Sequence, residues 1–186
     1  MSKRVVLIGR GHLGQFLKQR LGIADDMHFT GDLDAFEPFI KERQAEVVIN
    51  TAGKTSLEWC EANPLEAYRC NVTAPLNAFR ACRQHCDPYS FMFIHISSGC
   101  VWDGPYDPSG RPFKPTSPVT PQCFYSWTKA SFDALLMLEG KTSERIILRP
   151  RQVYSPVQSH RNTLAKLRLY PNLIDTPNSM TSAETI

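Results

Sequence analysis

The sequence has no long hydrophobic run. Although 42% of its 186 residues are hydrophobic, no apolar stretch approaches the about 18 residues that a membrane span needs, so we expect no membrane contact. The start, MSKRVVLIGRGHLG, has a basic pair and a short apolar run, but glycines follow at once and no small-residue cleavage site appears. We interpret this start as part of the fold and expect a cytoplasmic protein.

The sequence also has little excess charge. A net charge of +3 is too small to indicate nucleic-acid binding, and basic and aromatic residues do not alternate along any stripe. The charge is uneven, however, because from Lys141 onward seven basic residues stand against three acidic ones. This bias favours an anionic ligand, with a solvated surface as the alternative.

A disulfide framework is not expected, although the chain has six cysteines. They fall in predicted helices and strands of a full-sized apolar pattern, which favours free thiols in a reducing compartment. Cys82, His85 and Cys86 have a spacing that could share a metal ion, but no second pair of ligands accompanies them. We therefore expect them to pack within a helix and predict no metal site.

Short apolar runs alternate with segments of helical spacing. The runs KRVVLIG, AEVVIN (45–50), FMFIHISS (91–98) and ERIILRP predict buried strands, and MHFT (27–30) predicts a further short one. Helical spacing covers 13–21, 34–43 with an Asp34-x-x-Glu37 capping pattern, two helices within 56–86 that meet near Asn71 at the prolines 64 and 75, and 126–139.

Six prolines within 103–121 predict a loop between the last helix and the strand before it. Strands that are apolar on both sides and alternate with helices predict an α/β protein with a doubly wound parallel sheet, the Rossmann fold. The alternation ends near Pro150. We therefore predict a nucleotide-binding domain over 1–150 and part of a second lobe over 151–186.

The first chemical motif is a glycine-rich turn between a strand and a helix. It reads Gly9-Arg10-Gly11-His12-Leu13-Gly14. In this setting the glycines permit a tight turn and the close approach of a pyrophosphate, whose charge meets the free amides of the helix start. The motif predicts dinucleotide binding, with a plain turn as the alternative.

The second motif joins a serine with a Tyr-x-x-x-Lys sequence. Ser98 ends the strand FMFIHISS, where the ligands of open α/β sheets bind. Tyr125 and Lys129 lie four residues apart at the start of a helix, so they are neighbours on one face. The pair is either a chance surface contact or a proton donor with the group that tunes it.

Together these motifs resemble the extended short-chain dehydrogenase/reductase family. The blocks VVINTAGKTSLEWCEANPLEAYRCNV, HISSGCVWDG, FYSWTKA, ILRPRQVYSP and PNSMT are similar to its branch of dTDP-4-dehydrorhamnose reductases and plant UDP-rhamnose epimerase/reductases. The resemblance implies an NAD(P)H-dependent reductase of a nucleotide-linked 4-keto-6-deoxy sugar. Tyr125 would be the general acid, Lys129 would lower the pKa of Tyr125 and hold the nicotinamide ribose, and Ser98 would orient the substrate oxygen.

The resemblance also implies roles for neighbouring residues. The cofactor would contact the glycine-rich turn, Tyr125, Lys129, and also Asp32, Leu33, Thr51, Ala52, Gly53 and Asn71. The substrate would contact Ser98, Gly99, Cys100, Arg161 and Asn162.

The chain departs from the family pattern in two places. Its glycine turn is one residue shorter, and no clear acidic residue ends a long second strand, so Arg10 could meet a 2′-phosphate and we favour NADP(H) over NAD(H). Family chains also run well beyond PNSMTSAETI, which implies a truncated C-terminal substrate lobe. A catalytically inactive NAD(P)-binding regulatory subunit and a sugar-nucleotide epimerase stay open as alternatives, and so does a homodimer.

Overall fold

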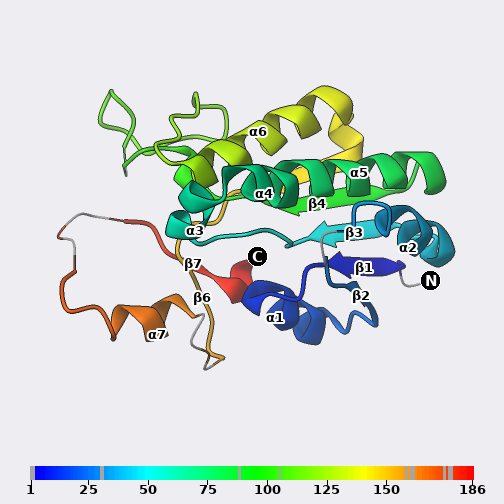
Figure 1. Ribbon diagram of the computed structural model, residues 1–186, viewed down its shortest axis with the longest axis horizontal. Coiled ribbons are helices and arrows are strands. Elements are labelled where there is room, and N and C mark those ends of the chain that lie inside the picture. Colours follow the sequence, from blue (N-terminus) through cyan, green and yellow to red (C-terminus); the bar gives the residue numbers. More distant parts are fainter. Residues whose placement is uncertain are drawn as a thin grey trace.

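The computed structural model describes residues 3–29, 32–87, 89–104, 106–157, 159, 162–173, 175 and 178–186. Its centre is a parallel sheet of five strands in the order β2-β1-β3-β4-β5 (Figure 1). The strands are β1 (Val5–Ile8), β2 (Asp25–Met27), β3 (Val47–Asn50), β4 (Met92–Ile96) and β5 (Arg145–Leu148). All four pairings are parallel, which confirms the predicted sheet.

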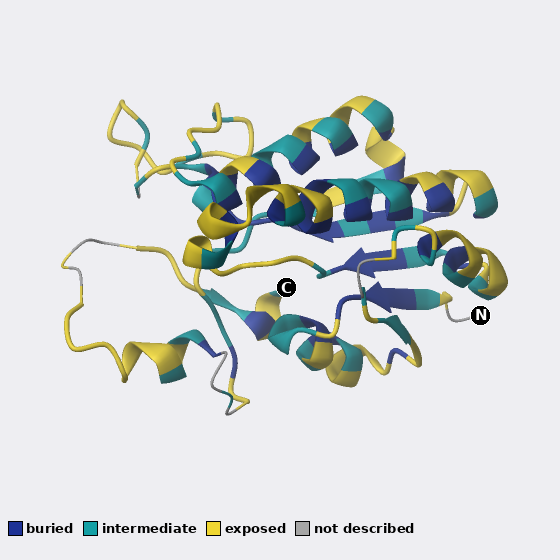
Figure 2. Cartoon of the chain, in the orientation of Figure 1, coloured by how far each residue is buried: buried dark blue, intermediate teal, exposed yellow. Residues whose placement is uncertain are grey.

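Three long helices cover one face of the sheet. They are α2 (Phe36–Arg43), α5 (Ala74–His85) and α6 (Phe124–Glu139). Their apolar sides meet the strands in the larger core cluster, where Phe36, Phe79, Phe93 and Phe132 are fully buried. Figure 2 shows this buried layer between the helices and the sheet. Each such side chain contributes about 1.5–3 kcal/mol of burial free energy.

Helix α1 (His12–Leu21) covers the opposite face. Leu17 packs with Leu7 of β1 and Ile49 of β3 in a second, smaller core cluster. Helices therefore lie on both faces, as the doubly wound prediction requires. Cover is thinner at β5, where Ile146 is 41% exposed.

The short second strand begins earlier than predicted. Residues Asp25–Met27 pair with Val6–Ile8, whereas the sequence indicated 27–30, whose last residue lies outside the described ranges. The pairing ends at Met27 because β1 ends at Ile8, and Gly9 N–H then donates to Met27 O at 2.8 Å as the chain turns.

The predicted capping box at Asp34 and Glu37 is wrong. Helix α2 is preceded by Ala35, and no side chain caps it. The Glu37 carboxylate instead lies 2.9 Å from His85 Nε2 at the end of α5. Glu37 therefore makes a contact between helices α2 and α5 and does not cap its own helix.

The region 57–85 contains more elements than the two predicted helices. It comprises α3 (Leu57–Ala62), α4 (Pro64–Tyr68), a π-helical turn (Arg69–Thr73) and α5. Pro64 separates α3 from α4, as expected, but Pro75 does not interrupt the chain. The reason is the π-helical turn, in which Ala74 N–H donates to Arg69 O, five residues earlier. This wider turn shifts the backbone at the point where the ring of Pro75 would otherwise clash with the preceding turn of an α-helix. Asn71 lies within this turn.

The last part of the described chain forms a separate small unit beside α1. Strands β6 (Val153–Tyr154) and β7 (Thr181–Ser182) pair in parallel, and helix α7 (Thr163–Leu167) lies between them in sequence. Short 3-10 turns occur at Gly99–Val101, Thr142–Glu144 and Ala183–Thr185. The domain boundary near Pro150 stays a prediction. In the described ranges, no helix has both the length and the apolar character to cross a membrane.

Candidate active site

The glycine-rich turn joins β1 to α1 at the carboxyl edge of the sheet. Gly9 has φ +107°, a conformation that favours glycine, and an added Cβ would lie 2.5 Å from Ala52 N. A Cβ on Gly14 would lie 2.1 Å from Gly9 O. Gly11 differs, because a Cβ added there would have no neighbouring atom within 4 Å. Gly9 and Gly14 therefore allow close backbone contacts within the turn, whereas the space beside Gly11 is open.

This difference gives a matched pair of substitutions. We expect Gly14→Ala to lower the free energy of unfolding by about 1–3 kcal/mol or more, because backbone atoms must move to admit the methyl group. Gly11→Ala should stay within about 1 kcal/mol of the wild type, because its backbone is extended and its surroundings are open. Urea unfolding measures both. Equal stability of the two variants would contradict the assigned roles of the glycines.

Ser98, Tyr125 and Lys129 come together beyond the end of β4. Ser98 follows the strand and begins a 3-10 turn, with its Oγ accepting from Cys100 N–H at 3.1 Å. The Ser98 side chain lies near the Tyr125 phenol and acts to lower its pKa. Lys129, one turn further along α6, donates from Nζ to Ile96 O at 2.9 Å. All three residues are buried.

The Tyr125 phenol is held in its neutral form. Burial raises the pKa of Tyr125 to about 12, and the nearby Ser98 side chain opposes this rise only in part. We expected Lys129 to lower the pKa of Tyr125, but burial outweighs any such effect in this chain. A neutral phenol can donate a proton, as a general acid must.

Burial acts on Lys129 in the opposite sense. It lowers the pKa of Lys129 to about 8, because a charged ammonium is disfavoured away from water, and the nearby Asp133 carboxylate opposes the shift. His95 Nε2 lies 3.3 Å from Lys129 Nζ. This ammonium therefore titrates close to neutral pH.

Thr51, Ala52, Gly53 and Asn71 connect the glycine turn to helix α6. Thr51 Oγ1 lies 3.1 Å from both Ile8 O and Gly9 O. Asn71 accepts from Lys54 N–H at 2.8 Å and donates to Thr128 Oγ1 at 3.0 Å. Gly53 lies between these contacts, and a Cβ there would be 3.0 Å from Asn71 Oδ1.

The far end of the glycine turn carries an ion cluster. The Arg10 and Lys18 side chains both pair with the Asp26 carboxylate of β2 and lower its pKa, Lys18 most strongly. Asp32 is exposed and accepts from Asp34 N–H, and Leu33 packs at the border of the larger core cluster. Asp26 is thus an acidic residue on the second strand, which the sequence pattern did not identify.

The predicted substrate residues do not form one group. Gly99 and Cys100 follow Ser98, and Gly99 lines a hollow of about 170 Å³ together with Arg149 and Arg151. The Asn162 amide is used locally, since it donates to Ser155 O and Val157 O at 2.7 and 2.9 Å. Arg161 lies outside the described residues.

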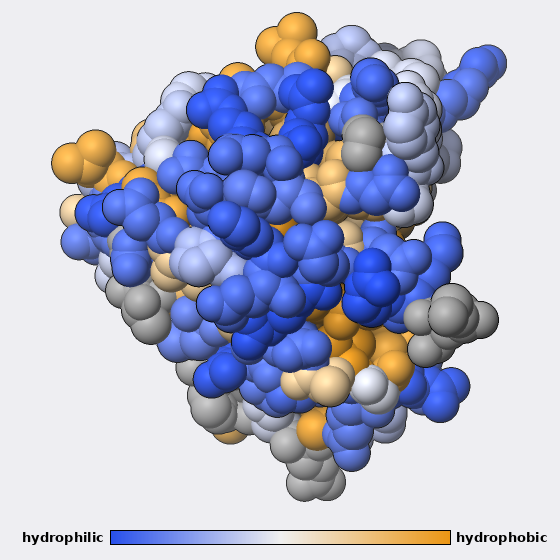
Figure 3. Space-filling model, turned by 90° about the vertical axis from the view of Figure 1, so that its right-hand side faces the viewer, coloured by the Kyte–Doolittle hydropathy of each residue, from blue (hydrophilic) through white to orange (hydrophobic). Residues whose placement is uncertain are grey.

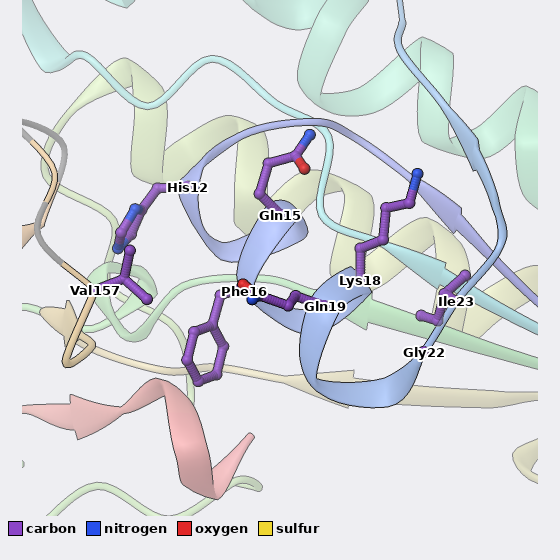
Figure 4. Close-up of a pocket in the computed structure, with 8 residues that line it drawn as sticks. All are labelled: His12, Gln15, Phe16, Lys18, Gln19, Gly22, Ile23 and Val157. Carbon is purple, nitrogen blue, oxygen red and sulfur yellow. The ribbon is translucent and has the colours of Figure 1, made fainter.

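A larger hollow of about 440 Å³ lies along α1 (Figure 4). His12, at the start of the helix, lines it, and so does Val157 from the C-terminal unit. Ser98, Tyr125 and Lys129 do not. The face at the amino ends of the strands is mainly hydrophilic, with apolar side chains showing in several separate places (Figure 3).

Sequence reasoning missed three buried polar residues beside Lys129. They are Asn50 at the end of β3, His95 within β4 and Asp133 in α6. Asp133 lies four residues after Lys129, the same spacing that identified Tyr125. Asn50 and His95 each lie in a run that predicts a buried apolar strand, so the pattern gives no separate signal for a polar site there.

Comparison with known proteins assigns the family. The family model described as the RmlD substrate binding domain matches residues 5–170. The chain belongs to this family. That confirms the resemblance predicted from the sequence.

Two curated relatives of this RmlD-family chain are named as reductases. The bifunctional dTDP-4-dehydrorhamnose 3,5-epimerase/dTDP-4-dehydrorhamnose reductase of Arabidopsis thaliana is 30% identical over an alignment of 171 residues, which covers 86% of this chain and 51% of that protein. The dTDP-4-dehydrorhamnose reductase of Mycobacterium tuberculosis is 29% identical over 83% of this chain and 51% of that protein. The chain therefore spans about half the length of these relatives.

Solved structures share the fold. A UDP-rhamnose synthase of Acanthamoeba polyphaga mimivirus has a TM-score of 0.79 at 21% identity, over 97% of this chain and 67% of that one. The dTDP-4-dehydrorhamnose reductase of Bacillus anthracis, solved in complex with NADP, has a TM-score of 0.74 at 19% identity, over 91% and 60%.

Proposed function

We propose that this chain forms the cofactor-binding and proton-donating part of a reductase that acts on a nucleotide-linked 4-keto-6-deoxy sugar. The observation that carries the proposal is the buried contact of Tyr125 with Ser98, with Lys129 one helical turn away, at the edge where the glycine turn opens. The reductase names of the curated relatives support the substrate class.

The residues present fit a nicotinamide dinucleotide. Gly11 leaves open space at the start of α1, where free backbone amides favour a pyrophosphate. Arg10 and Lys18 together outweigh the single charge of Asp26, which favours the 2′-phosphate of NADP(H) over NAD(H). Asp32 and Leu33 would lie by the adenine. Thr51, Ala52, Gly53 and Asn71 would line the path towards the nicotinamide.

The protein's part in the reaction follows from three side chains. The bound nicotinamide would supply the hydride. Ser98 Oγ would hydrogen-bond the sugar carbonyl oxygen, and Tyr125 would give its proton to the alkoxide that develops there. Lys129 would hold the nicotinamide ribose and supply positive charge beside the phenolate that Tyr125 leaves behind.

The remaining assignments concern the substrate and its surroundings. Gly99 and Cys100, with Arg161 and Asn162 from the C-terminal segment, would face the nucleotide sugar, and residues 151–186 would form part of its lobe. We place the reaction in the cytoplasm, where the six free thiols would stay reduced.

NADPH consumption separates this proposal from its alternatives. We expect the chain to oxidise NADPH in the presence of dTDP- or UDP-linked 4-keto-6-deoxy sugar, with one NADPH lost for each sugar reduced. Sugar conversion without net loss of NADPH would indicate an epimerase instead. Tight NADPH binding without any conversion would indicate a binding subunit, and either result would overturn the proposal.

A further inference from the structure

A row of buried polar side chains runs behind Lys129, from β3 through β4 to α6. Asn50 and His95 have no exposed surface, and Asp133 is 1% exposed. The row links the residues beside the glycine turn to the ammonium of Lys129. Buried polar groups must satisfy one another, so their donor and acceptor roles can be deduced.

The Asn50 amide has a fixed orientation. Its Oδ1 accepts from Ala52 N–H at 3.2 Å, and its Nδ2 lies 3.0 Å from His95 Nδ1. Turning the amide over would place its NH₂ group against the Ala52 N–H, two donors face to face. Asn50 Nδ2 therefore donates, and His95 Nδ1 must accept.

This contact determines the tautomer of His95. Burial and the neighbouring Lys129 hold the pKa of His95 well below its ordinary value, so the ring is neutral and has one N–H. With Nδ1 accepting, the proton lies on Nε2. Nε2 is 3.3 Å from Lys129 Nζ and 4.0 Å from Asp133 Oδ1. Lys129 Nζ is the nearer of these two atoms.

A charged Lys129 does not suit this arrangement. An ammonium has only donors, so it would face the Nε2–H of His95 with no acceptor between them, whereas a neutral amine can accept that proton and still donate to Ile96 O.

The charges around Lys129 offset this conflict only in part. Asp133 is the acidic group that faces Lys129 from α6. Its Oδ2 is paired with Arg149 Nε at 2.7 Å, just after β5, and its Oδ1 has no hydrogen-bond partner in the described part of the chain. Across the described residues, no carboxylate lies within ion-pair distance of Lys129. His95 is the titratable group that faces it from β4, and Tyr125 lies one turn before it on α6.

We propose that Asn50 holds His95 as its Nε2–H tautomer and that this tautomer makes the ammonium of Lys129 easier to deprotonate in the cofactor-free chain. Asn50 and His95 are then positioning residues, which act through Lys129. Because the Ala52 N–H that orients Asn50 belongs to the segment after β3 that would contact the cofactor, a shift of that segment on binding would release the tautomer and favour the charged form of Lys129. That last step rests on the proposed function, whereas the tautomer and its effect on Lys129 do not.

Nitrogen NMR reads the tautomer directly. In protein labelled with ¹⁵N-histidine, long-range proton–nitrogen spectra at pH 7 should show His95 with a protonated Nε2 and an unprotonated Nδ1, and His95→Gln assigns the signal. A protonated Nδ1, or an imidazolium, would overturn the proposal. The experiment needs neither cofactor nor turnover, so its failure is distinguishable from failure of the proposed reductase activity.

Carbon NMR reads the charge of Lys129. In protein labelled with ¹³C at lysine Cε, the Lys129 signal, assigned with Lys129→Gln, should titrate with a midpoint near pH 8. Asn50→Leu removes the donor to Nδ1 without adding charge, so His95 can present an acceptor and the midpoint should rise by about one pH unit. A wild-type midpoint near that of free lysine, or an unchanged midpoint in folded Asn50→Leu, would overturn the proposal. If Asn50→Leu does not fold, the tautomer of His95 and the titration midpoint of Lys129 in the wild type still test the proposal.

Discussion

Tyr125→Phe is expected to lower kcat by about 10² to 10⁴-fold while it leaves the Kd for NADPH within a few-fold of the wild type. The change removes one oxygen, and with it the proton that the developing alkoxide would receive. The buried ring keeps its place, because Tyr125 packs with Cys60 and Ala67 in a small apolar cluster of its own. Burial already keeps the phenol neutral, so the whole effect should fall on the chemical step.

The measurement is NADPH oxidation with the keto sugar, together with NADPH binding followed by fluorescence. Tyr89→Phe is the matched control, since Tyr89 is 98% exposed and should tolerate the same change without loss of rate. A loss of less than about tenfold in Tyr125→Phe would exclude this phenol as the general acid. An equal loss in both variants would point to a general effect of the substitution.

Asp133→Ala is expected to lower the free energy of unfolding by about 3–5 kcal/mol. Asp133 is the partner of Arg149, whose side chain is only 12% exposed. Removing the carboxylate leaves a largely buried guanidinium without its counter-charge, and it also takes away the negative group that faces Lys129. Two buried cations would then remain close together in the same part of the core.

Chemical unfolding in urea measures this loss. Glu139→Gln is the matched control, because it breaks an ion pair with Arg80 on the surface of the same helix α6. Exposed pairs of this kind contribute less than about 1 kcal/mol, so the control should remain close to the wild type. If the two variants lost the same stability, Asp133 would not be the buried counter-charge that its position indicates.

The sequence predicts those parts of the fold that depend on local pattern. Apolar runs located the long strands, and helical spacing located α1, α5 and α6, because burial on one or both sides imposes that spacing. Likewise, Tyr125 and Lys129 could be paired from their four-residue separation. The glycine turn was found from its position between a strand and a helix.

Features that depend on contacts between distant segments could not be predicted. The Asp34 and Glu37 pattern fits a cap, but His85, 48 residues away from Glu37, takes its carboxylate. The expected effect of Lys129 on Tyr125 considered charge alone and left out burial, which decides the pKa of both groups. Asn50 and His95 meet only because β3 and β4 are neighbours, with Asn50 opposite His95 in the register.

Transfer of deuterium tests the central claim most directly. The chain is incubated with the keto sugar nucleotide and NADPH that carries deuterium on the transferable position of the nicotinamide. We expect deuterium at C4 of the reduced sugar in the wild type, and the same labelled product formed about 10² to 10⁴-fold more slowly in Tyr125→Phe. A reduced sugar without deuterium at C4, or labelled product formed by Tyr125→Phe at the wild-type rate, would contradict the proposed mechanism.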